Sequence, residues 1–238
     1  MATVGGVHRF MADRKILIAG GGTGGHLFPA LAIGEEIHRR EPDTKIHYVG
    51  SKFGLEARVF PVKDVWHTLL PIRGFQRGIS MQRMGRNLLL PVRIIRSMLK
   101  LRSLMKDFLP QVVVGTGGYA SALPLYMASK KEEPLPIVLQ EQNSFPGVTT
   151  RWFAQKAKTI CVAFNEANDH LEKETIRTGN PVRQGIADGD RTNGMNEFKL
   201  AEDHQTIFLF GGSQGSAYLN KMMNQVVSNI AGAGLQVL

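Results

Sequence analysis

The chain has 238 residues and a formal net charge of +9; 43% of its residues are hydrophobic and 21% are charged. This composition is ordinary for a globular protein and excludes general disorder. The single cysteine, Cys161, cannot form an internal disulfide, and no Cys and His residues have the spacing of a structural zinc site. We therefore predict an intracellular chain without a metal in its framework.

Short apolar segments alternate with longer amphipathic ones along the first part of the chain. The pattern predicts strands at 15–19, 45–50, 111–115, 136–140 and 159–164, and helices at 26–40, 81–107, from about 122, and 147–158. The strands are nearly continuous runs of Val, Ile and Leu, as in parallel sheets covered on both faces. The sequence thus predicts a doubly wound α/β domain at 15–186, after an N-terminal extension at 1–14.

The composition then changes to Gly, Asp, Asn, Arg and Glu, which is typical of a linker, here at 187–205. A strand at 206–210, a Gly-rich loop, a helix at 217–231 and the start of another strand follow. So few residues cannot bury both faces of a sheet. We predict that 206–238 begin a second domain that is incomplete here.

A glycine-rich turn, GGGTGGH at 20–26, joins the first predicted strand to its helix. Glycines allow backbone N–H groups to approach a phosphate, and the helix N-terminus adds positive potential. Gly20, Gly22 and Gly25 also match the G-x-G-x-x-G pattern of dinucleotide-binding oxidoreductases. That alternative requires an acidic residue after the second strand, where this chain has Gly50, Ser51 and Lys52.

Two more glycine-rich turns follow predicted strands, at 115–121 and 211–216. Any one of them could be only a tight turn between a strand and a helix. Three such turns, two in one domain and one in the next, favour a phosphate-bearing ligand in a cleft between domains.

His26 follows the first turn directly and should lie on the first turn of a helix. A helix N-terminus favours the neutral imidazole, which can accept a proton. A buried structural histidine is the alternative. The adjacent glycine-rich loop favours a catalytic base.

Five segments together resemble the MurG family of UDP-N-acetylglucosamine transferases, which act on undecaprenyl-pyrophosphoryl-N-acetylmuramoyl-pentapeptide. They are ILIAGGGTGGHLFPALAI, VVVGTGGYAS, LQEQNSFPGVTTR, TGNPVR and FLFGGSQGSAYLN, between residues 15 and 220. The resemblance implies the GT-B fold, with two Rossmann-like domains and an active site between them. It implies inverting transfer of N-acetylglucosamine from UDP-N-acetylglucosamine to that lipid-linked acceptor, in peptidoglycan synthesis, and no cofactor. Another lipid glycosyltransferase of the same fold remains an alternative.

The resemblance also implies roles for individual residues. Contacts to the UDP-sugar are implied for Thr23, Gly24, Gly25, Asn143, Arg183 and Ser213. A loop facing the acceptor pyrophosphate is implied for Gly117, Gly118, Tyr119 and Ser121. His26 would deprotonate the acceptor hydroxyl. Glu141 is either an alternative base or a carboxylate that orders its neighbours.

The excess positive charge lies in one segment, which has nine Lys or Arg residues and no Asp or Glu between 73 and 106. Basic residues and the apolar residues Leu88, Val92, Ile95 and Leu99 form separate stripes at helical spacing. The alternatives are a solvated basic face and an anionic membrane surface, and a polyprenyl-linked substrate favours the membrane. The predicted membrane contacts are Arg86, Arg93, Arg96, Leu88 and Leu89.

The first dozen residues lack the apolar core of a signal peptide, and no segment reaches the roughly 18 to 20 apolar residues that span a bilayer. We therefore expect a peripheral protein at the cytoplasmic face of the membrane. Nucleic acid is not an expected partner, because aromatic residues make up only 8% of the chain and the basic segment interleaves aliphatic residues.

Overall fold

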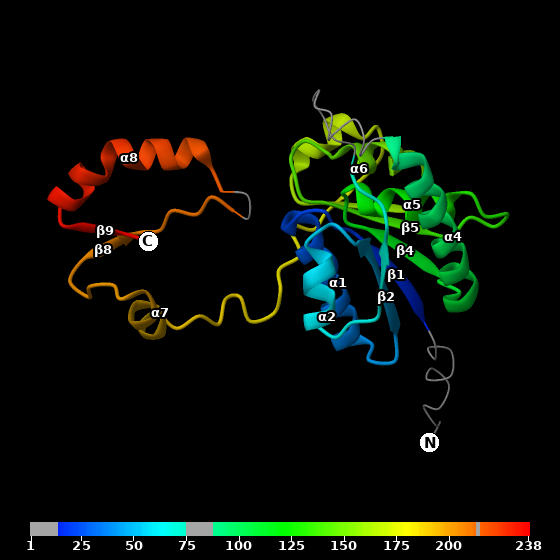
Figure 1. The fold of residues 1–238 in the computed structure, drawn as a ribbon, viewed down its shortest axis with the longest axis horizontal. Helices are drawn as coiled ribbons and strands as arrows, with labels where there is room; N and C mark the ends of the chain where they lie inside the picture. Colours follow the sequence, from blue (N-terminus) through cyan, green and yellow to red (C-terminus); the bar gives the residue numbers. More distant parts are fainter. Residues whose placement is uncertain (1–13, 75–87, 213–214) are drawn as a thin grey trace, which may run out of the picture. The chain divides into compact units, whose positions relative to one another are not determined.

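A computed structural model describes residues 14–74, 88–212 and 215–238 (Figure 1). The chain divides into two compact units, Met1–Arg183 and Gln184–Leu238.

Unit 1 contains one parallel sheet. Its strands are β1 (Lys15–Ala19), β2 (Lys45–Ser51), β3 (His67–Leu70), β4 (Val112–Gly115), β5 (Ile137–Glu141), β6 (Thr159–Val162) and β7 (Ile176–Arg177). Its helices are α1 (Gly24–Arg40), α2 (Glu56–Val62), α4 (Leu90–Phe108), α5 (Tyr119–Ser129) and α6 (Val148–Phe153), with the 3-10 helices η1 (Ala154–Lys156) and η2 (Asn165–His170).

The strand order is β3-β2-β1-β4-β5-β6-β7, and every neighbouring pair is parallel. The direction in which strands are added reverses between β1 and β4. In open parallel sheets, ligands bind outside the carboxyl ends of the strands at such a switch point. The predicted doubly wound α/β domain is confirmed.

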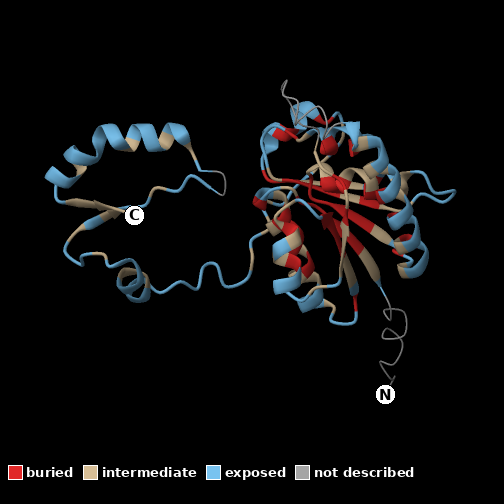
Figure 2. Cartoon of the chain, in the orientation of Figure 1, coloured by how far each residue is buried: buried red, intermediate tan, exposed pale blue. Residues whose placement is uncertain are grey.

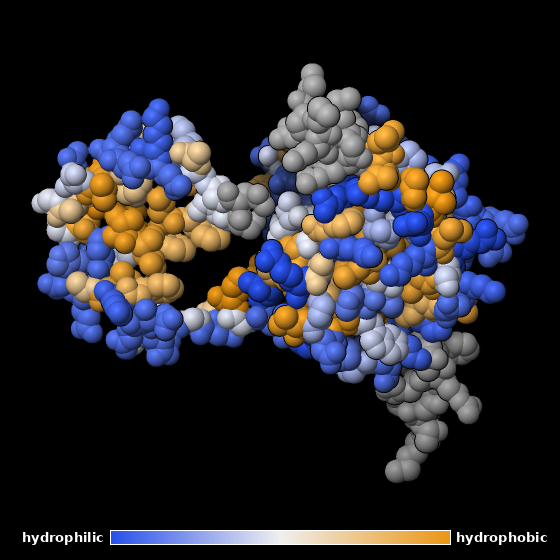
Figure 3. Space-filling view, viewed as in Figure 1, coloured by the Kyte–Doolittle hydropathy of each residue, from blue (hydrophilic) through white to orange (hydrophobic). Residues whose placement is uncertain are grey.

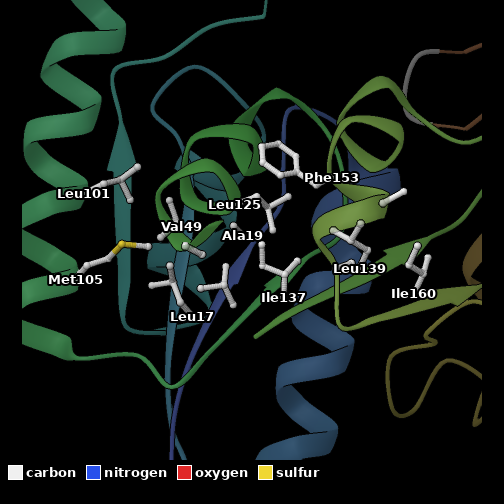
Figure 4. Packing of buried hydrophobic residues seen from close by; sticks show 14 of the residues in the cluster. Leu17, Ala19, Val49, Leu101, Met105, Leu125, Ile137, Leu139, Phe153 and Ile160 are labelled. Carbon is white, nitrogen blue, oxygen red and sulfur yellow. The ribbon is translucent and has the colours of Figure 1, made fainter. Parts of the chain in front are cut away.

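Alternating side chains of the strands build a core on each face of the sheet. Leu17 and Ala19 of β1 pack on the face covered by α4, α5 and α6, whereas Ile18 packs on the face covered by α1 and α2. Figure 2 shows the buried residues concentrated along the sheet. Figure 4 shows the first core, where Leu101 from α4 and Leu125 from α5 approach the strands. The two layers anchor the strand ends that carry the glycine-rich turns.

The predicted strand at 15–19 has the limits of β1, and the other predicted strands of this sheet differ from the observed ones by one or two residues. Four elements of unit 1 were not predicted: α2, β3, η2 and β7. They are short, and β3 has only four residues, HTLL, which do not alternate polar with apolar side chains. Pairing with β2, rather than a local pattern, makes β3 a strand.

Pro91 explains where α4 begins in the described chain. The sequence predicted a helix over 81–107, in which Pro91 would start, kink or divide it. Pro91 occupies the first turn, where its missing N–H leaves no intrahelical hydrogen bond unmade. The part of the prediction at 81–87 lies outside the described residues. Leu109, in the left-handed conformation, ends the helix.

Unit 2 contains α7 (Arg191–Phe198), β8 (Gln205–Ile207), α8 (Ala217–Gly232) and β9 (Leu235–Val237). β8 and β9 are parallel, as the predicted strand, loop and helix pattern required. None of its described residues is buried. Phe208 and Phe210 are exposed, and their rings stack with centroids 5.9 Å apart. Figure 3 shows apolar side chains gathered on this unit.

The predicted linker at 187–205 is not a continuous loop, because it contains α7. The side chain of Asp190 accepts a hydrogen bond from the backbone N–H of Asn193, 2.8 Å away, and so caps the helix N-terminus. The division between the units falls after Arg183, close to the predicted end of the first domain at 186.

We expect the stability of unit 1 to fall in mild acid because of His47. Burial, together with the charge of His67, lowers the pKa of His47 from 6.5 to about 4. As the pH falls below 6.5, His47 becomes protonated in the unfolded chain but stays neutral in the folded one. The free energy of unfolding therefore decreases. Urea unfolding at pH 7 and pH 5 should show that His47→Gln removes roughly 1 kcal/mol of this loss, allowing for partial exposure. If His47→Gln left the pH dependence of the free energy of unfolding unchanged, this prediction would be wrong.

Candidate active site at the switch point

The first two glycine-rich turns lie against each other at the carboxyl ends of β1 and β4. A Cβ atom on Gly118 would lie 2.1 Å from the carbonyl oxygen of Gly21, and one on Gly117 would lie 3.0 Å from Nδ1 of His26. Gly117 and Gly118 also have φ values of +92° and +75°. Only glycine allows this approach, which brings His26 to the junction of both turns.

The ring of His26 is held through Nδ1, which lies 3.1 Å from the carbonyl oxygen of Thr116. A carbonyl oxygen can only accept a hydrogen bond, so this contact places the proton on Nδ1. In the neutral ring, Nε2 then carries the lone pair that accepts a proton. The hydroxyl of Thr116 donates to the carbonyl oxygen of His26 at 2.7 Å and ties β4 to α1 from the other side.

Gln142 is a further partner that sequence reasoning missed. Its Oε1 atom lies 3.2 Å from Nδ1 of His26, and its Nε2 donates to the carbonyl oxygen of Thr116 at 2.8 Å. Gln142 directly follows Glu141 at the end of β5, so its place in a strand-end segment was a usable signal. Three strand ends therefore fix the orientation of one imidazole.

Glu56 holds the first glycine-rich turn through hydrogen bonds, and no sequence pattern indicated this role. The carboxylate is fully buried and accepts hydrogen bonds from the N–H groups of Gly22, at 3.1 and 3.0 Å, and of Ser51, at 2.7 Å. Cβ atoms on Gly21 or Gly54 would lie 2.4 and 2.3 Å from its oxygens. The N–H of Gly22 is thus already used, so an anion at this turn would meet the N–H groups further along.

Those further N–H groups belong to the predicted UDP-sugar contacts Thr23, Gly24 and Gly25. Thr23 is the residue before α1, its side chain makes no capping hydrogen bond, and Thr23 and Gly25 are exposed. α1 is 17 residues long and has no acidic residue in its first turn. The N-terminus of such a helix is suited to bind a phosphate.

Arg183 lies close to the same helix end. Its guanidinium carbon is 4.4 Å from the ring centroid of Phe28, and a Cβ atom on Gly24 would lie 3.2 Å from that ring. Asn180, in the same TGNPVR segment, donates through Nδ2 to the carbonyl oxygen of Gln142 at 3.5 Å. The segment after β7 is thereby brought to the predicted donor residues.

Glu141 orders its neighbours. It is buried, and Oε1 accepts from the backbone N–H and the Nδ2 of Asn143 at 3.1 and 2.9 Å, while Oε2 accepts from the N–H of Gly147 at 3.0 Å. Of its two predicted roles, these contacts favour the structural one. Asn143, a predicted donor contact, is exposed and oriented by this carboxylate.

Tyr119 and Ser121, predicted to face the acceptor pyrophosphate, use their side chains within the fold. The ring of Tyr119 packs between Gly22 and Gly74, where Cβ atoms would lie 2.7 and 3.0 Å from it. Burial raises the pKa of the Tyr119 hydroxyl. Ser121 is buried and its hydroxyl donates to the carbonyl oxygen of Gly118 at 2.9 Å. Of these four residues, Gly117 and Ser121 are buried, whereas Gly118 and Tyr119 are half-buried.

The remaining predicted residues are Ser213 and the five predicted membrane contacts. Ser213 and Arg86 lie outside the described residues. Leu88, Leu89 and Arg96 are exposed at or near α4, whereas Arg93 is half-buried and turns toward Phe53. In the described ranges, no group of three or more His, Cys, Asp or Glu residues could hold a metal ion.

A parallel sheet whose switch point carries two glycine-rich turns is the arrangement found in the N-terminal domain of GT-B glycosyltransferases. The crystal structure of Acinetobacter baumannii MurG has this fold: it superposes with a TM-score of 0.65 and 22% identity, over 91% of this chain and 57% of that one. The sequence profile of the glycosyltransferase family 28 N-terminal domain matches residues 16–162, more than half of the chain. The chain belongs to glycosyltransferase family 28.

Curated relatives confirm the predicted resemblance to the MurG family. The UDP-N-acetylglucosamine–N-acetylmuramyl-(pentapeptide) pyrophosphoryl-undecaprenol N-acetylglucosamine transferase of Flavobacterium psychrophilum is 37% identical over 96% of this chain and 61% of its own length. The enzyme of the same name from Bacteroides thetaiotaomicron is 40% identical over 92% of this chain and 58% of its own length. The chain thus spans about 60% of the length of these relatives.

Proposed function

We propose that the full-length protein transfers N-acetylglucosamine from UDP-N-acetylglucosamine to undecaprenyl-pyrophosphoryl-N-acetylmuramoyl-pentapeptide, with inversion at the anomeric carbon. The observation that carries the proposal is His26, whose Nδ1 is held by the carbonyl oxygen of Thr116 at the junction of two glycine-rich turns. The names of the curated relatives support the same donor and acceptor.

The proposed chemistry is direct displacement. Nε2 of His26 takes the proton of the acceptor sugar hydroxyl while that oxygen forms a bond to the anomeric carbon of N-acetylglucosamine. The bond from the anomeric carbon to the UDP oxygen breaks, and UDP leaves with its electron pair. The N-terminus of α1 and the guanidinium of Arg183 are suited to the negative charge of the donor diphosphate.

An activity assay tests this proposal. The full-length protein is incubated with radiolabelled UDP-N-acetylglucosamine and a lipid-linked acceptor in detergent, and labelled lipid product is measured. We expect product that depends on the acceptor sugar. Release of free N-acetylglucosamine alone, or transfer only to diacylglycerol, would contradict the proposal.

We also propose that the protein binds the cytoplasmic face of the membrane through α4. Among the described residues, no helix is long and apolar enough to cross a bilayer. Leu88, Val92, Ile95 and Leu99 are nevertheless exposed, at 81%, 48%, 58% and 63%. Such a stripe beside the exposed cations Arg96 and Lys100 suits an anionic interface.

A cavity between α4 and α5 extends this apolar surface. Its volume is about 870 Å³, and its walls include Ile95, Met98 and Leu99. Arg102, Lys106, Lys130 and Lys131 also line it. Apolar walls with cations beside them suit lipid tails below anionic headgroups. Ile72, directly before the basic segment, is buried and does not belong to this apolar surface.

Vesicle binding tests the membrane proposal. The triple variant Val92→Ser, Ile95→Ser and Leu99→Ser should bind anionic phospholipid vesicles at least about tenfold more weakly, because it removes apolar surface from the interface. The matched control is Val62→Ser with Trp66→Ser, which changes exposed apolar residues around α2 and should bind as the unchanged protein does. Equal loss in both variants, or in neither, would contradict the proposal.

A further inference from the structure

Phe53, which lies between β2 and α2, has two guanidinium groups beside its ring. The guanidinium carbon of Arg73 lies 3.9 Å from the ring centroid and that of Arg93 lies 5.4 Å from it. Arg73 follows β3 and Arg93 lies on α4, so three elements contribute to this group. Cation–π contacts with the ring of Phe53 hold both guanidinium groups in place.

Neither arginine of this pair has a carboxylate partner in the part of the chain that the structure describes. Among the ion pairs of the described residues, none includes Arg73 or Arg93. The Nε of Arg73 is buried and has no hydrogen-bond partner within the described chain. Two nearby like charges and an unmade buried hydrogen bond both cost free energy. An anion with several acceptor oxygens would offset both costs.

The position of the two arginines indicates which anion they would bind. Arg73 precedes Gly74, and a Cβ atom on Gly74 would lie 3.0 Å from the ring of Tyr119. Tyr119 begins α5 directly after Gly117 and Gly118. The cations therefore lie beside the second glycine-rich turn, whereas the apolar stripe of α4 lies on its exposed side.

We propose that Arg73 and Arg93 bind the pyrophosphate of the lipid-linked acceptor and so position its sugar toward His26. Guanidinium groups bind phosphoryl oxygens through paired N–H donors, and two of them match two linked phosphates. This inference rests on the proposed transferase function, and it assigns the acceptor to residues outside the glycine-rich motifs.

Steady-state kinetics of the full-length protein test the assignment. The assay uses detergent, a short-chain prenyl-pyrophosphoryl acceptor and UDP-N-acetylglucosamine. Arg73→Gln and Arg93→Gln should each raise the acceptor KM about 10- to 100-fold and leave the donor KM within about twofold. Arg73→Lys should raise the acceptor KM less than Arg73→Gln does, because lysine keeps the positive charge but lacks the paired N–H donors of a guanidinium group. Arg58→Gln, an exposed cation of α2, is the matched control and should change neither KM.

A second acceptor separates phosphate binding from a general effect on the fold. With an N-acetylmuramoyl-peptide that lacks the pyrophosphate, Arg73→Gln and the unchanged protein should have equal kcat/KM. If Arg73→Gln does not fold, the same comparison is made with Arg93→Gln, because Arg93 lies on α4 and is half-buried.

The possible failures are distinct. No transfer by the unchanged protein would overturn the proposed function itself. Normal transfer with an unaltered acceptor KM in both arginine variants would overturn this inference alone. A loss that appears only on anionic vesicles, and not in detergent, would assign the pair to phospholipid headgroups and also overturn it.

Discussion

His26→Ala is expected to lower the turnover of the full-length protein about 100-fold or more, while UDP-N-acetylglucosamine binds nearly as well as before. Loss of a general base typically costs two to four orders of magnitude in rate. The donor should still bind, since the predicted donor contacts are the backbone of α1's first turn and Arg183. Single-turnover kinetics and calorimetric titration with the UDP-sugar measure the two quantities.

His38→Ala is the matched control for this variant. His38 lies exposed in the last turn of the same helix, far along the chain from the glycine-rich turn. It should alter neither turnover nor binding. If His26→Ala kept full turnover, His26 would be a structural residue held by Thr116.

Glu56→Ala is expected to lower the free energy of unfolding by about 2 to 5 kcal/mol. The change leaves the N–H groups of Gly22 and Ser51 without their acceptor, and each unsatisfied buried donor costs about 1 to 3 kcal/mol. It also leaves a void beneath the first glycine-rich turn. Urea unfolding followed by circular dichroism measures the change.

Glu35→Ala is the comparison for this loss. Glu35 pairs with Lys63 at 3.1 Å near the surface, and removing such a pair should cost less than about 1 kcal/mol. If Glu56→Ala cost no more than Glu35→Ala, the carboxylate would not be what holds the turn. Glu56→Gln should give an intermediate loss, because it keeps one acceptor oxygen.

The fold was predictable where local pattern and burial agree. β1 and β4 are runs of Val, Ile and Leu buried on both faces, so the sequence alone located them. α2 is seven residues long with Pro61 inside it, and β3 has only four residues. Both depend on packing against β2, which no local signal reveals. The helix within the predicted linker begins at a capping side chain, Asp190.

The site was predictable in part. The glycine-rich turns and His26 lie next to each other in sequence, and their local context indicates an anion site with a base. Glu56 and Arg73 belong to other segments, so their contacts with this site could not be inferred from spacing. Gln142 could have been suspected only from its place at the end of a strand. Tyr119 and Ser121 lie in the expected loop, but packing turns their side chains inward.

The sequence by itself determined the alternation of strands and helices, the glycine-rich turns and the basic segment, because each depends on residues that are neighbours along the chain. Only the tertiary structure decided three contacts. The carbonyl oxygen of Thr116 holds Nδ1 of His26, and Glu56 accepts a hydrogen bond from the N–H of Gly22. The ring of Phe53 contacts the guanidinium groups of two arginines. The physical reason is that a hydrogen bond or a ring contact is set by distances of a few ångströms. Those distances arise only when distant strand ends meet at one edge of the sheet.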